Sequence, residues 1–532
     1  MDTKALRQKI LDLAIRGKLV PQDPNDEPAE VLLERIREQK QQMLKEGKLK
    51  KKDIKNDTII FKGEDNLHYE KFQDGTVKCI EDEIPFEVPE GWEWTRLGSV
   101  FSTATGSTPS TKDSSLYGTD YPFYKPTDLD AGYNVLISED FVSKKGYCSG
   151  RQLPKFSVLV TCIGTIGKTG YIRKAGICNQ QINAILPTDE IMSEYVYFCM
   201  CSQFEQQQIQ MNSSATTLPI LNKRKFDNLL FLIPPHKQQL LIVDKIQSLL
   251  SSVDEIQNNQ AILRNTVTET KAKILDLAIR GKLVPQDSND EPASVLLERI
   301  SSEKEELIKQ GKIKRDKKES VIFKGDDNSY YEKIDGEVSC IDEEIPYDIP
   351  DTWTWMRLEN CCVKEIRRGK SPKYAEISNV IVFAQKCNTK YNGIDISLAQ
   401  YLDKTTIKRY PTDEHMQDGD IVINSTGTGT LGRVGIYRNT DNTTGLLIVP
   451  DSHVTVIRSF RCISSHYLYA FMKAHQIELE KKGEGSTNQK ELKPLTLKEM
   501  LIAVPPLSEQ KRIEKSINVA FSHLAIIEKC LN

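Results

Sequence analysis

Several features that define common protein classes are missing from this chain of 532 residues. The longest purely apolar runs, such as Leu229 to Ile233, are far too short to cross a bilayer. The first residues form a charged amphipathic segment and lack the apolar core of a secretory signal. We therefore expect no membrane contact and a cytoplasmic location.

An excess of charge of one sign is also missing. Lysine plus arginine total 72 against 75 acidic residues, which gives a formal net charge of −3. This balance excludes a wholly basic coat for nucleic acid but leaves room for a local basic face. With 39% hydrophobic and 28% charged residues, the composition is that of an ordinary globular protein of several domains.

Motifs for metal, redox and cofactor chemistry are missing too. The twelve cysteines include no CxxC pair and have no histidines at zinc-finger spacing, so we interpret them as reduced structural thiols. Gly427, Gly429 and Gly432 match a dinucleotide fingerprint, but a strand is expected after them where a helix is required. Gly164 to Thr169 resembles a phosphate loop with two residues in place of four between its glycines. We expect a chain that is no enzyme and binds no metal or cofactor itself.

What the chain does contain is an internal repeat. The segments 9–36 and 273–300 differ only at Pro24/Ser288 and Glu30/Ser294. All four tryptophans lie in a second shared element, as pairs at 92/94 and 353/355. The i, i+2 spacing places each pair on one face of a strand, and we interpret the indoles as core anchors and not as a ligand cage.

A long helix is predicted where the two copies join. Apolar residues follow heptad spacing from 236 to Arg280, and Gly281 ends the pattern. The C-terminal segment matches the first part of this helix, and the N-terminal segment, up to Gly17, matches its last part. The second copy of the helix is thus divided between the chain ends, which predicts a pseudo-twofold axis. The residues expected to pack between the helices are Ile246, Leu249, Val253, Ile256, Leu263, Val267, Ile274, Leu277, Ile517, Leu524 and Leu531.

Between the shared elements lie two divergent regions, 98–225 and 359–490, each predicted to be an α/β head with a strand, a glycine hairpin and a second strand. Helices are expected at 193–211 and 465–481. The fold class is therefore α+β, with two pseudo-twofold-related α/β heads and the long central helix between them. The predicted boundaries are 1–17 (N-terminal half of the distal helix), 18–84 and 282–344 (connectors), 85–235 and 345–506 (heads), 236–281 (central helix) and 507–532 (C-terminal helix).

The two connectors contain lysine-rich stretches, Lys45 to Lys55 and Lys304 to Lys318, and carry apolar residues at helical spacing. The simpler interpretation is a short amphipathic helix followed by a solvated loop. The alternative is a non-specific contact with phosphate groups.

Taken together, the motifs resemble the specificity (S) subunit of type I restriction–modification systems. The resemblance spans essentially the whole chain and is carried by AIRGKLVPQDPNDEPA in both copies, the Trp-Glu-Trp strand, GSTPSTK, CIGTIGKTG, the residues 485–490 and the terminal PPLSEQKRI. The sequence departs from the family pattern at Phe156-Ser157, where Gly-Asp is usual as in Gly419-Asp420, and at 234–239, a looser form of PPLxEQ.

This resemblance implies a non-catalytic subunit in which two long antiparallel helices, a coiled-coil spacer, separate two target-recognition domains. The domains read the two halves of an asymmetric bipartite target in double-stranded DNA, and the helices set the gap. It also implies docking of two modification (methyltransferase) subunits and, in the restriction complex, of two restriction (translocase/endonuclease) subunits. S-adenosylmethionine, ATP and Mg are implied only through those partners.

Base selection requires side chains that reach base edges, whereas phosphate contacts only position the protein. The candidates on predicted loops are Lys112, Tyr124, Lys125, Arg151, Lys168, Gln180 and Gln181 in the first head, and Arg367, Arg368, Lys370, Lys373, Asn424 and Arg433 in the second. Two alternatives stay open at this point: a self-contained methyltransferase or nucleotide-binding enzyme that uses Gly427 to Gly432, and an architectural coiled-coil adaptor.

Overall fold

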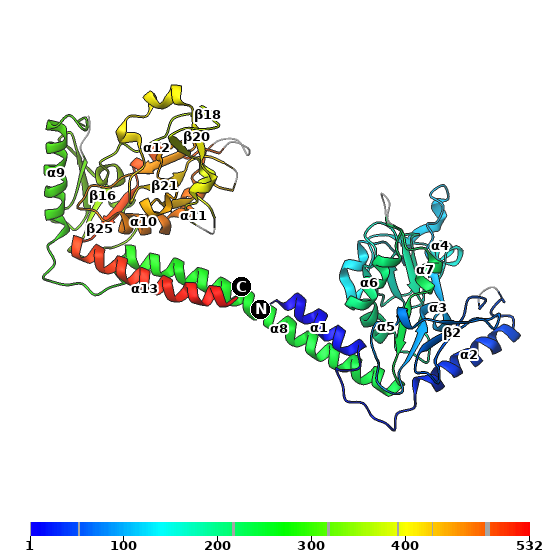
Figure 1. Ribbon diagram of the computed structural model, residues 1–532. Coiled ribbons are helices and arrows are strands. Elements are labelled where there is room, and N and C mark those ends of the chain that lie inside the picture. The colour runs from blue at the N-terminus through cyan, green and yellow to red at the C-terminus, as the bar shows by residue number, and fades with distance from the viewer. Residues whose placement is uncertain are drawn as a thin grey trace. The chain divides into compact units, whose positions relative to one another are not determined.

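The computed structural model describes residues 2–51, 54–214, 219–315, 320–390, 393–427, 429–484 and 490–531. The chain divides into two compact units, Met1–Gln260 and Ala261–Asn532. Helix α8 (His236–Ile279) contributes its first part to one unit and its last part to the other. In both units a helix, a second helix, a three-stranded sheet, a mixed α/β head and a final helix follow in this order, coloured blue to green in the first and green to red in the second (Figure 1). The motif residues 485–489 lie outside the described residues.

In the first unit, α1 (Thr3–Ile15) packs on the first part of α8. Ile10, Leu11 and Ile15 share a buried cluster with Ile242 and Ile246. Arg7 forms an ion pair with Asp254, and the Asp2 carboxylate accepts from the first backbone amides of α1. The helix stops at Gly17 as predicted. Gly17 has a φ of +65°, and a Cβ there would lie 2.3 Å from the ring of Pro89, so only glycine fits.

In the second unit, α13 (Leu507–Leu531) packs antiparallel on the last part of α8. Lys271 Nζ lies 2.7 Å from a carboxylate oxygen of Glu528, and Arg264 Nη2 donates to the backbone oxygen of Leu531. At the other end of the pair, Ile513 and Ile517 share a buried cluster with Leu275 and Ile279. Both units therefore contain an antiparallel helix pair, as the resemblance implies.

Most of the predicted helix-packing residues are buried or half-buried. The buried ones are Ile246, Val253, Val267, Ile517 and Leu531, and the half-buried ones are Leu249, Ile256, Ile274, Leu277 and Leu524. Leu263 is the exception and the prediction is wrong there, because its side chain is 40% exposed. The end of α13 lies level with Arg264, so no turn of α13 covers the preceding residue.

Each head has a four-stranded antiparallel sheet. In the first head its order is β5-β11-β8-β9, and in the second β17-β24-β21-β22. The strands are β5 (Thr103–Thr105), β8 (Val158–Thr161), β9 (Thr169–Tyr171) and β11 (Ile182–Ile185), and β17 (Arg367–Arg368), β21 (Ile421–Asn424), β22 (Val434–Ile436) and β24 (Val454–Ile457). The predicted strand–hairpin–strand units are β8-β9 and β21-β22, which confirms them.

A second sheet in each head contains one parallel pair, β6 with β10 and β19 with β23, and its order is β10-β6-β7 or β18-β20-β19-β23. A two-stranded pair, β4-β12 or β16-β25, joins each head to its helices. These strands are β4 (Glu93–Arg96), β6 (Tyr117–Tyr124), β7 (Phe141–Val142), β10 (Ile177–Cys178), β12 (Leu230–Ile233), β16 (Thr354–Arg357), β18 (Tyr374–Ala375), β19 (Val380–Phe383), β20 (Gln400–Leu402), β23 (Leu447–Pro450) and β25 (Leu501–Val504). The α+β class with two α/β heads is therefore confirmed.

The strand registers give a residue-by-residue correspondence between the heads. Thr105 pairs with Asn183, which pairs with Val160, while Arg368 pairs with Thr455, which pairs with Ile423. Thr105 therefore occupies the position of Arg368. The segments between tryptophan and double proline differ in sequence, but their four-stranded antiparallel sheets share one strand order in the same register, whereas the second sheet has one strand more in the second head.

Helices complete each head. The single helices predicted at 193–211 and 465–481 are each two helices, because the chain turns at Ser202 and at His475; the Ser202 hydroxyl accepts from the amide of Glu205 and starts the second helix. The helices are α3 (Leu97–Val100), α4 (Lys144–Ser149), α5 (Ser193–Met200), α6 (Gln203–Asn212), α7 (Lys223–Asp227), α10 (Ser465–Ala474), α11 (Gln476–Lys481) and α12 (Pro494–Lys498). No helix in the described part of the chain is long and apolar enough to span a membrane.

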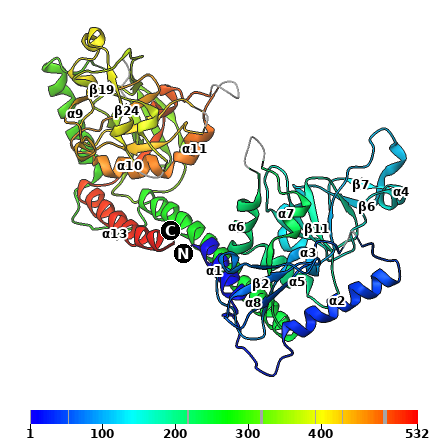
Figure 2. The ribbon, with the colours of Figure 1, turned by 45° about the vertical axis from the view of Figure 1, so that its right-hand side comes forward.

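The connectors contain more structure than a helix and a solvated loop. The predicted helices are present as α2 (Ala29–Lys45) and α9 (Ala293–Lys309), and α2 runs along the outside of the first unit (Figure 2). The lysine-rich residues after each helix, 46–51 and 310–315, form turns and contain no strand, as predicted, but a three-stranded antiparallel sheet that the sequence did not predict follows each of them. The strands are β1 (Ile59–Lys62), β2 (His68–Lys71) and β3 (Val77–Cys79), and β13 (Ser320–Lys324), β14 (Tyr330–Ile334) and β15 (Glu337–Cys340).

The tryptophans are core anchors, as predicted. Trp94 and Trp355 are fully buried. Trp92 Nε1 donates to Gln22 Oε1 and Gln238 Oε1 at 3.0 and 3.2 Å, and Trp353 Nε1 donates to Glu509 Oε2 at 2.9 Å. The looser double-proline motif thus places Gln238 where the second unit has Glu509, and either side chain accepts a hydrogen bond from the indole N–H.

Candidate nucleic-acid interface

Three loops meet at one end of the four-stranded sheet in the first head. Strands β5 and β8 end there and β9 and β11 begin there, so the loops 106–113, 162–168 and 179–181 lie at the same edge. The Gly106 amide donates to the Ile182 carbonyl at 2.9 Å, and Thr108 Oγ1 donates to Gln180 Oε1 at 2.6 Å. These bonds tie the first loop to the third.

Glycine is required where these two loops approach each other. A Cβ on Gly106 would lie 2.1 Å from the carbonyl oxygen of Asn179, and a Cβ on Gly369 would lie 2.3 Å from that of Asp451. The Gly369 amide donates to the Val454 carbonyl at 3.0 Å, in the position of the bond from Gly106 to Ile182. Both heads therefore bring the same two loops together through one glycine.

Most of the first head's candidates lie on or beside this end. Lys112, Arg151 and Gln180 are exposed, and Gln181 is half-buried. Arg151 Nη1 donates to the backbone oxygen of Thr105 at 2.5 Å. The loop 106–113 carries Lys112, the loop 179–181 carries Gln180 and Gln181, and the bond to Thr105 brings Arg151 to the same end of the sheet.

Two further lysines of the first head have acidic partners. Lys125 Nζ lies 2.5 Å from Asp140 and Lys168 Nζ lies 2.7 Å from Asp130. Lys125 follows directly after β6, beside the start of the loop 179–181, because the Asn179 amide donates to the Tyr124 carbonyl.

Tyr124 and Asn424 were wrong candidates for contact with bases, because both end strands and are buried. The Tyr124 hydroxyl donates to the carbonyl of Lys174 at 2.9 Å, and burial raises the pKa of this phenol well above its usual value. Asn424 Nδ2 donates to the carbonyl of Gln385 and its Oδ1 accepts from Asn388 Nδ2, both at 3.2 Å. Both side chains hold the core of their head together.

The second head gathers its candidates at the equivalent end. Arg367 and Arg368 lie on β17, and the loop 369–373 carries Lys370 and the exposed Lys373. Arg368 forms an ion pair with Glu491.

Arg433 stabilises the glycine hairpin of the second head, because its guanidinium donates to the carbonyls of Asn388 at 2.8 Å and Gly429 at 3.2 Å. After Gly432 the chain enters β22, as predicted, and no helix opens there. Residue 428 of the fingerprint lies outside the described residues.

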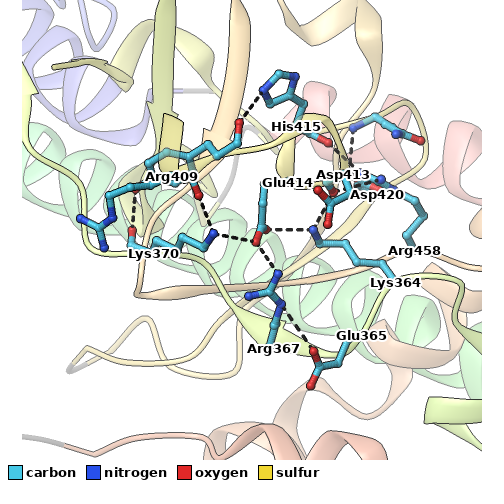
Figure 3. A network of polar contacts seen from close by, with 12 residues as sticks. Lys364, Glu365, Arg367, Lys370, Arg409, Asp413, Glu414, His415, Asp420 and Arg458 are labelled. Carbon is cyan, nitrogen blue, oxygen red and sulfur yellow. Dashed lines mark hydrogen bonds and ion pairs between the residues drawn. The ribbon is translucent and has the colours of Figure 1, made fainter. Parts of the chain in front are cut away.

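The candidates Arg367 and Lys370 converge on Glu414, which the sequence did not single out (Figure 3). The Glu414 carboxylate is 3% exposed and lies 3.0 Å from Lys364 Nζ and 3.5 Å from Lys370 Nζ, and it accepts from Arg367 Nη2. Burial alone would raise the pKa of Glu414, but the hydrogen bond from Lys364 and the charges of the three cations outweigh burial and lower it. The carboxylate is therefore ionised and surrounded by cations.

A second buried carboxylate lies nearby, where the sequence follows the family pattern Gly-Asp. Asp420 forms a bidentate pair with Arg458, with both contacts at 2.7 Å, and Arg458 also donates to the carbonyl of His415 (Figure 3). Burial raises the pKa of Asp420 although Arg458 opposes that effect. In the first head Ser157 takes this position. Phe156 adopts a φ of +72° there, against +84° at Gly419, so the departure keeps the backbone and changes the side chains.

Within the described residues, no three histidine, cysteine or acidic side chains are grouped so that they could hold a metal ion. The arrangement offers amide, hydroxyl and cationic groups on loops at one end of each sheet. Such groups suit hydrogen bonding to phosphates and base edges.

Comparisons of this chain with known proteins agree on one family. A family model described as the type I restriction modification DNA specificity domain matches residues 89–264 and 350–532. The chain is 26% identical to the specificity subunit of the type I restriction enzyme EcoEI of Escherichia coli, over 97% of this chain and 89% of that one. It is 30% identical to that of EcoAI of Escherichia coli, over 67% of this chain and 62% of that one.

A solved structure shares the fold. The HsdS subunit from Thermoanaerobacter tengcongensis superposes with a TM-score of 0.50 at 17% identity, covering 85% of this chain and 94% of that one. The two ranges that match the family model include both heads and leave out α2, α9 and the three-stranded sheets.

Proposed function

Since this chain belongs to the type I restriction modification DNA specificity family, we propose that it reads a bipartite target in double-stranded DNA, one half-site with each head. The observation that carries this proposal is that the two heads share sheet registers and the glycine approach of their loops, yet present different side chains there. Two frames of one kind with unlike loops suit two unlike half-sites.

The side chains at the loop ends fit the two tasks of a DNA reader. Exposed cations such as Lys112 and Lys373 would contact phosphates and position the head. Gln180 and Gln181 have the amide geometry that pairs with adenine, and Arg367 has the guanidinium that pairs with guanine. The near-neutral chain would rely on its partners for much of the affinity for DNA.

The repeated parts would serve the partners. The segments 9–36 and 273–300 offer nearly the same surface twice, which suits two copies of one partner, the modification (methyltransferase) subunit. Two restriction (translocase/endonuclease) subunits would join in the restriction complex. The methyltransferase would bring S-adenosylmethionine, and the translocase would bring ATP and Mg. The chain itself would remain non-catalytic and act in the cytoplasm, where the host DNA lies.

The experiment is an exchange of one head. Residues 98–233 are replaced by the corresponding region of another specificity subunit, the chain is expressed with its modification subunits, and methylated bases in the host genome are mapped by long-read sequencing. We expect one half of the methylated motif to change while the other half and the gap remain. A matched exchange of 359–490 should change the other half. Loss of both halves, or a motif that neither exchange alters, would contradict the proposal.

A further inference from the structure

The two heads carry opposite charges at one equivalent position. The Leu153 amide donates to the Gly176 carbonyl at 2.8 Å, and the Met416 amide donates to the Ile448 carbonyl at 2.9 Å. Each of these amides lies two residues after a charged side chain, Arg151 in the first head and Glu414 in the second. The next strand, β8 or β21, then follows in the same register.

These two side chains meet the same strand and loop. Arg151 donates to Thr105, whose position in the second head belongs to Arg368. By the same register Ala104 corresponds to Arg367, and Ser107 corresponds to Lys370, one residue after the glycine. The first head therefore places one cation against uncharged residues, and the second head places one carboxylate among cations.

The carboxylate of Glu414 holds its cations but leaves some of their N–H donors available to a ligand. Three cations, Lys364, Arg367 and Lys370, surround the one carboxylate of Glu414, and a second carboxylate, Glu365, lies 3.7 Å from Arg367 Nε. Glu414 is buried, whereas the side chains of Arg367 and Lys370 remain 39% and 30% exposed. An arginine offers five N–H donors, so one bond to Glu414 leaves others for a ligand. Holding a long side chain in one conformation also lowers the entropy lost when it binds.

We propose that Glu414 is a specificity-determining positioning residue of the second head, which holds Arg367 and Lys370 in the geometry that reads this head's half-site. The inference rests on the proposed function, since it requires that the second head binds DNA. In the first head Arg151, at the same position, presents the cation itself.

The test uses the full chain expressed with its modification subunits, and the readout is the methylated motif in the host genome. E414Q keeps the shape of the side chain and removes the charge that holds Arg367 and Lys370. We expect methylated sites with other bases at one or more positions of the second half-site, with discrimination there reduced roughly tenfold, within the range of one side chain–base contact. The first half-site should stay invariant.

The matched control is D420N. It neutralises an equally buried carboxylate of the same head, which pairs with Arg458 and contacts neither Arg367 nor Lys370. If E414Q acted only by disturbing the structure of the head, D420N should relax the methylated motif to the same degree. Equal relaxation in the two variants would therefore overturn the inference. A double-mutant cycle adds a second measurement. E414Q and R367Q should be non-additive in their effect on base discrimination, because Glu414 acts in part through the Arg367 guanidinium. Additive effects would count against Glu414 as a positioning residue.

The possible failures are separable. If the unmodified chain and its partners yield no bipartite motif, the proposed function itself is wrong. If the motif is present and E414Q leaves both half-sites as stringent as before, only the assignment of Glu414 is overturned. E414D supports the case if E414Q folds poorly: the shorter carboxylate retains the charge but moves it away from the cations, and we expect a smaller relaxation of the same half-site.

Discussion

Glu93 provides a prediction in which one unit serves as the control for the other. This residue lies on β4 between the two buried tryptophans of the first unit, and it is half-buried. Burial, the largest cause, and the nearby charge of Glu30 together raise the pKa of Glu93 to about 7 against the opposing effect of Arg37. In the second unit the same two positions are Thr354 and Ser294, so neither the carboxylate nor its repulsion is present.

The sign and size of the effect follow from this shift. The ordinary pKa of 4.5 describes the unfolded chain, so the folded unit binds the Glu93 proton more tightly than the unfolded one. Such a group stabilises the fold most below pH 4.5, and the stability falls as the pH rises toward about 7. At about 1.4 kcal/mol per pH unit, the full shift amounts to roughly 3 kcal/mol, and partial exposure reduces it to about 1–3 kcal/mol.

The substitution E93T transfers the residue of the second unit to the first. We expect E93T to exceed the unmodified chain in stability by about 1–3 kcal/mol at pH 8 and to lose that advantage near pH 4.5. Urea unfolding at the two pH values measures the difference, and hydrogen exchange of peptides from β4 and β12 assigns it to the first unit. The reciprocal substitution T354E should destabilise the pair β16 and β25 at pH 8 by less than Glu93 destabilises the first unit, because Ser294 carries no charge that would repel the new carboxylate. An advantage of E93T that is equal at both pH values would refute the reasoning.

Two further predictions concern the core and the spacer. R96M should lower the free energy of unfolding of the first unit by about 3–5 kcal/mol, measured in urea, because Arg96 is 6% exposed and the buried Glu70 would lose its cation. R357M should cost the second unit less, since Arg357 is 17% exposed. Equal losses would contradict the argument. Four residues inserted after Asn258, in the exposed middle of α8, should add about 6 Å of helix and lengthen the unspecified gap by roughly two base pairs. Altered half-sites with an unchanged gap in the methylome would contradict that account.

The features that the sequence predicted well are those that leave a periodic or duplicated trace. The repeat required both units to share their elements, and the heptad spacing required a long helix that ends before Gly281. The paired tryptophans required a buried strand. In each case hydrophobic burial determines the residue pattern directly, so the pattern is visible without knowledge of the partners in space.

Other features left no such trace. The strands β1 to β3 bury only Ile60 and Glu70 between lysines and glutamates, so their sequence resembles that of a solvated loop. Tyr124 and Asn424 lie next to proline or glycine turns and therefore seemed exposed, although each ends a buried strand. Glu414 gains its partners from residues about fifty positions earlier in the chain, and no local pattern encodes such a contact.

The divergence of the heads has a physical basis in these registers. Gly106 and Gly369 fix how closely two loops approach, and the backbone bonds around them are the same in both heads. Side chains at the loop ends can then change charge without disturbing the sheet, provided that each buried charge has a partner. Arg151 meets a backbone carbonyl, and Glu414 meets three cations. A substitution of Glu414 alone would leave its three cations without the buried carboxylate that they share, so a change of specificity in the second head would require Glu414 and its cations to change together.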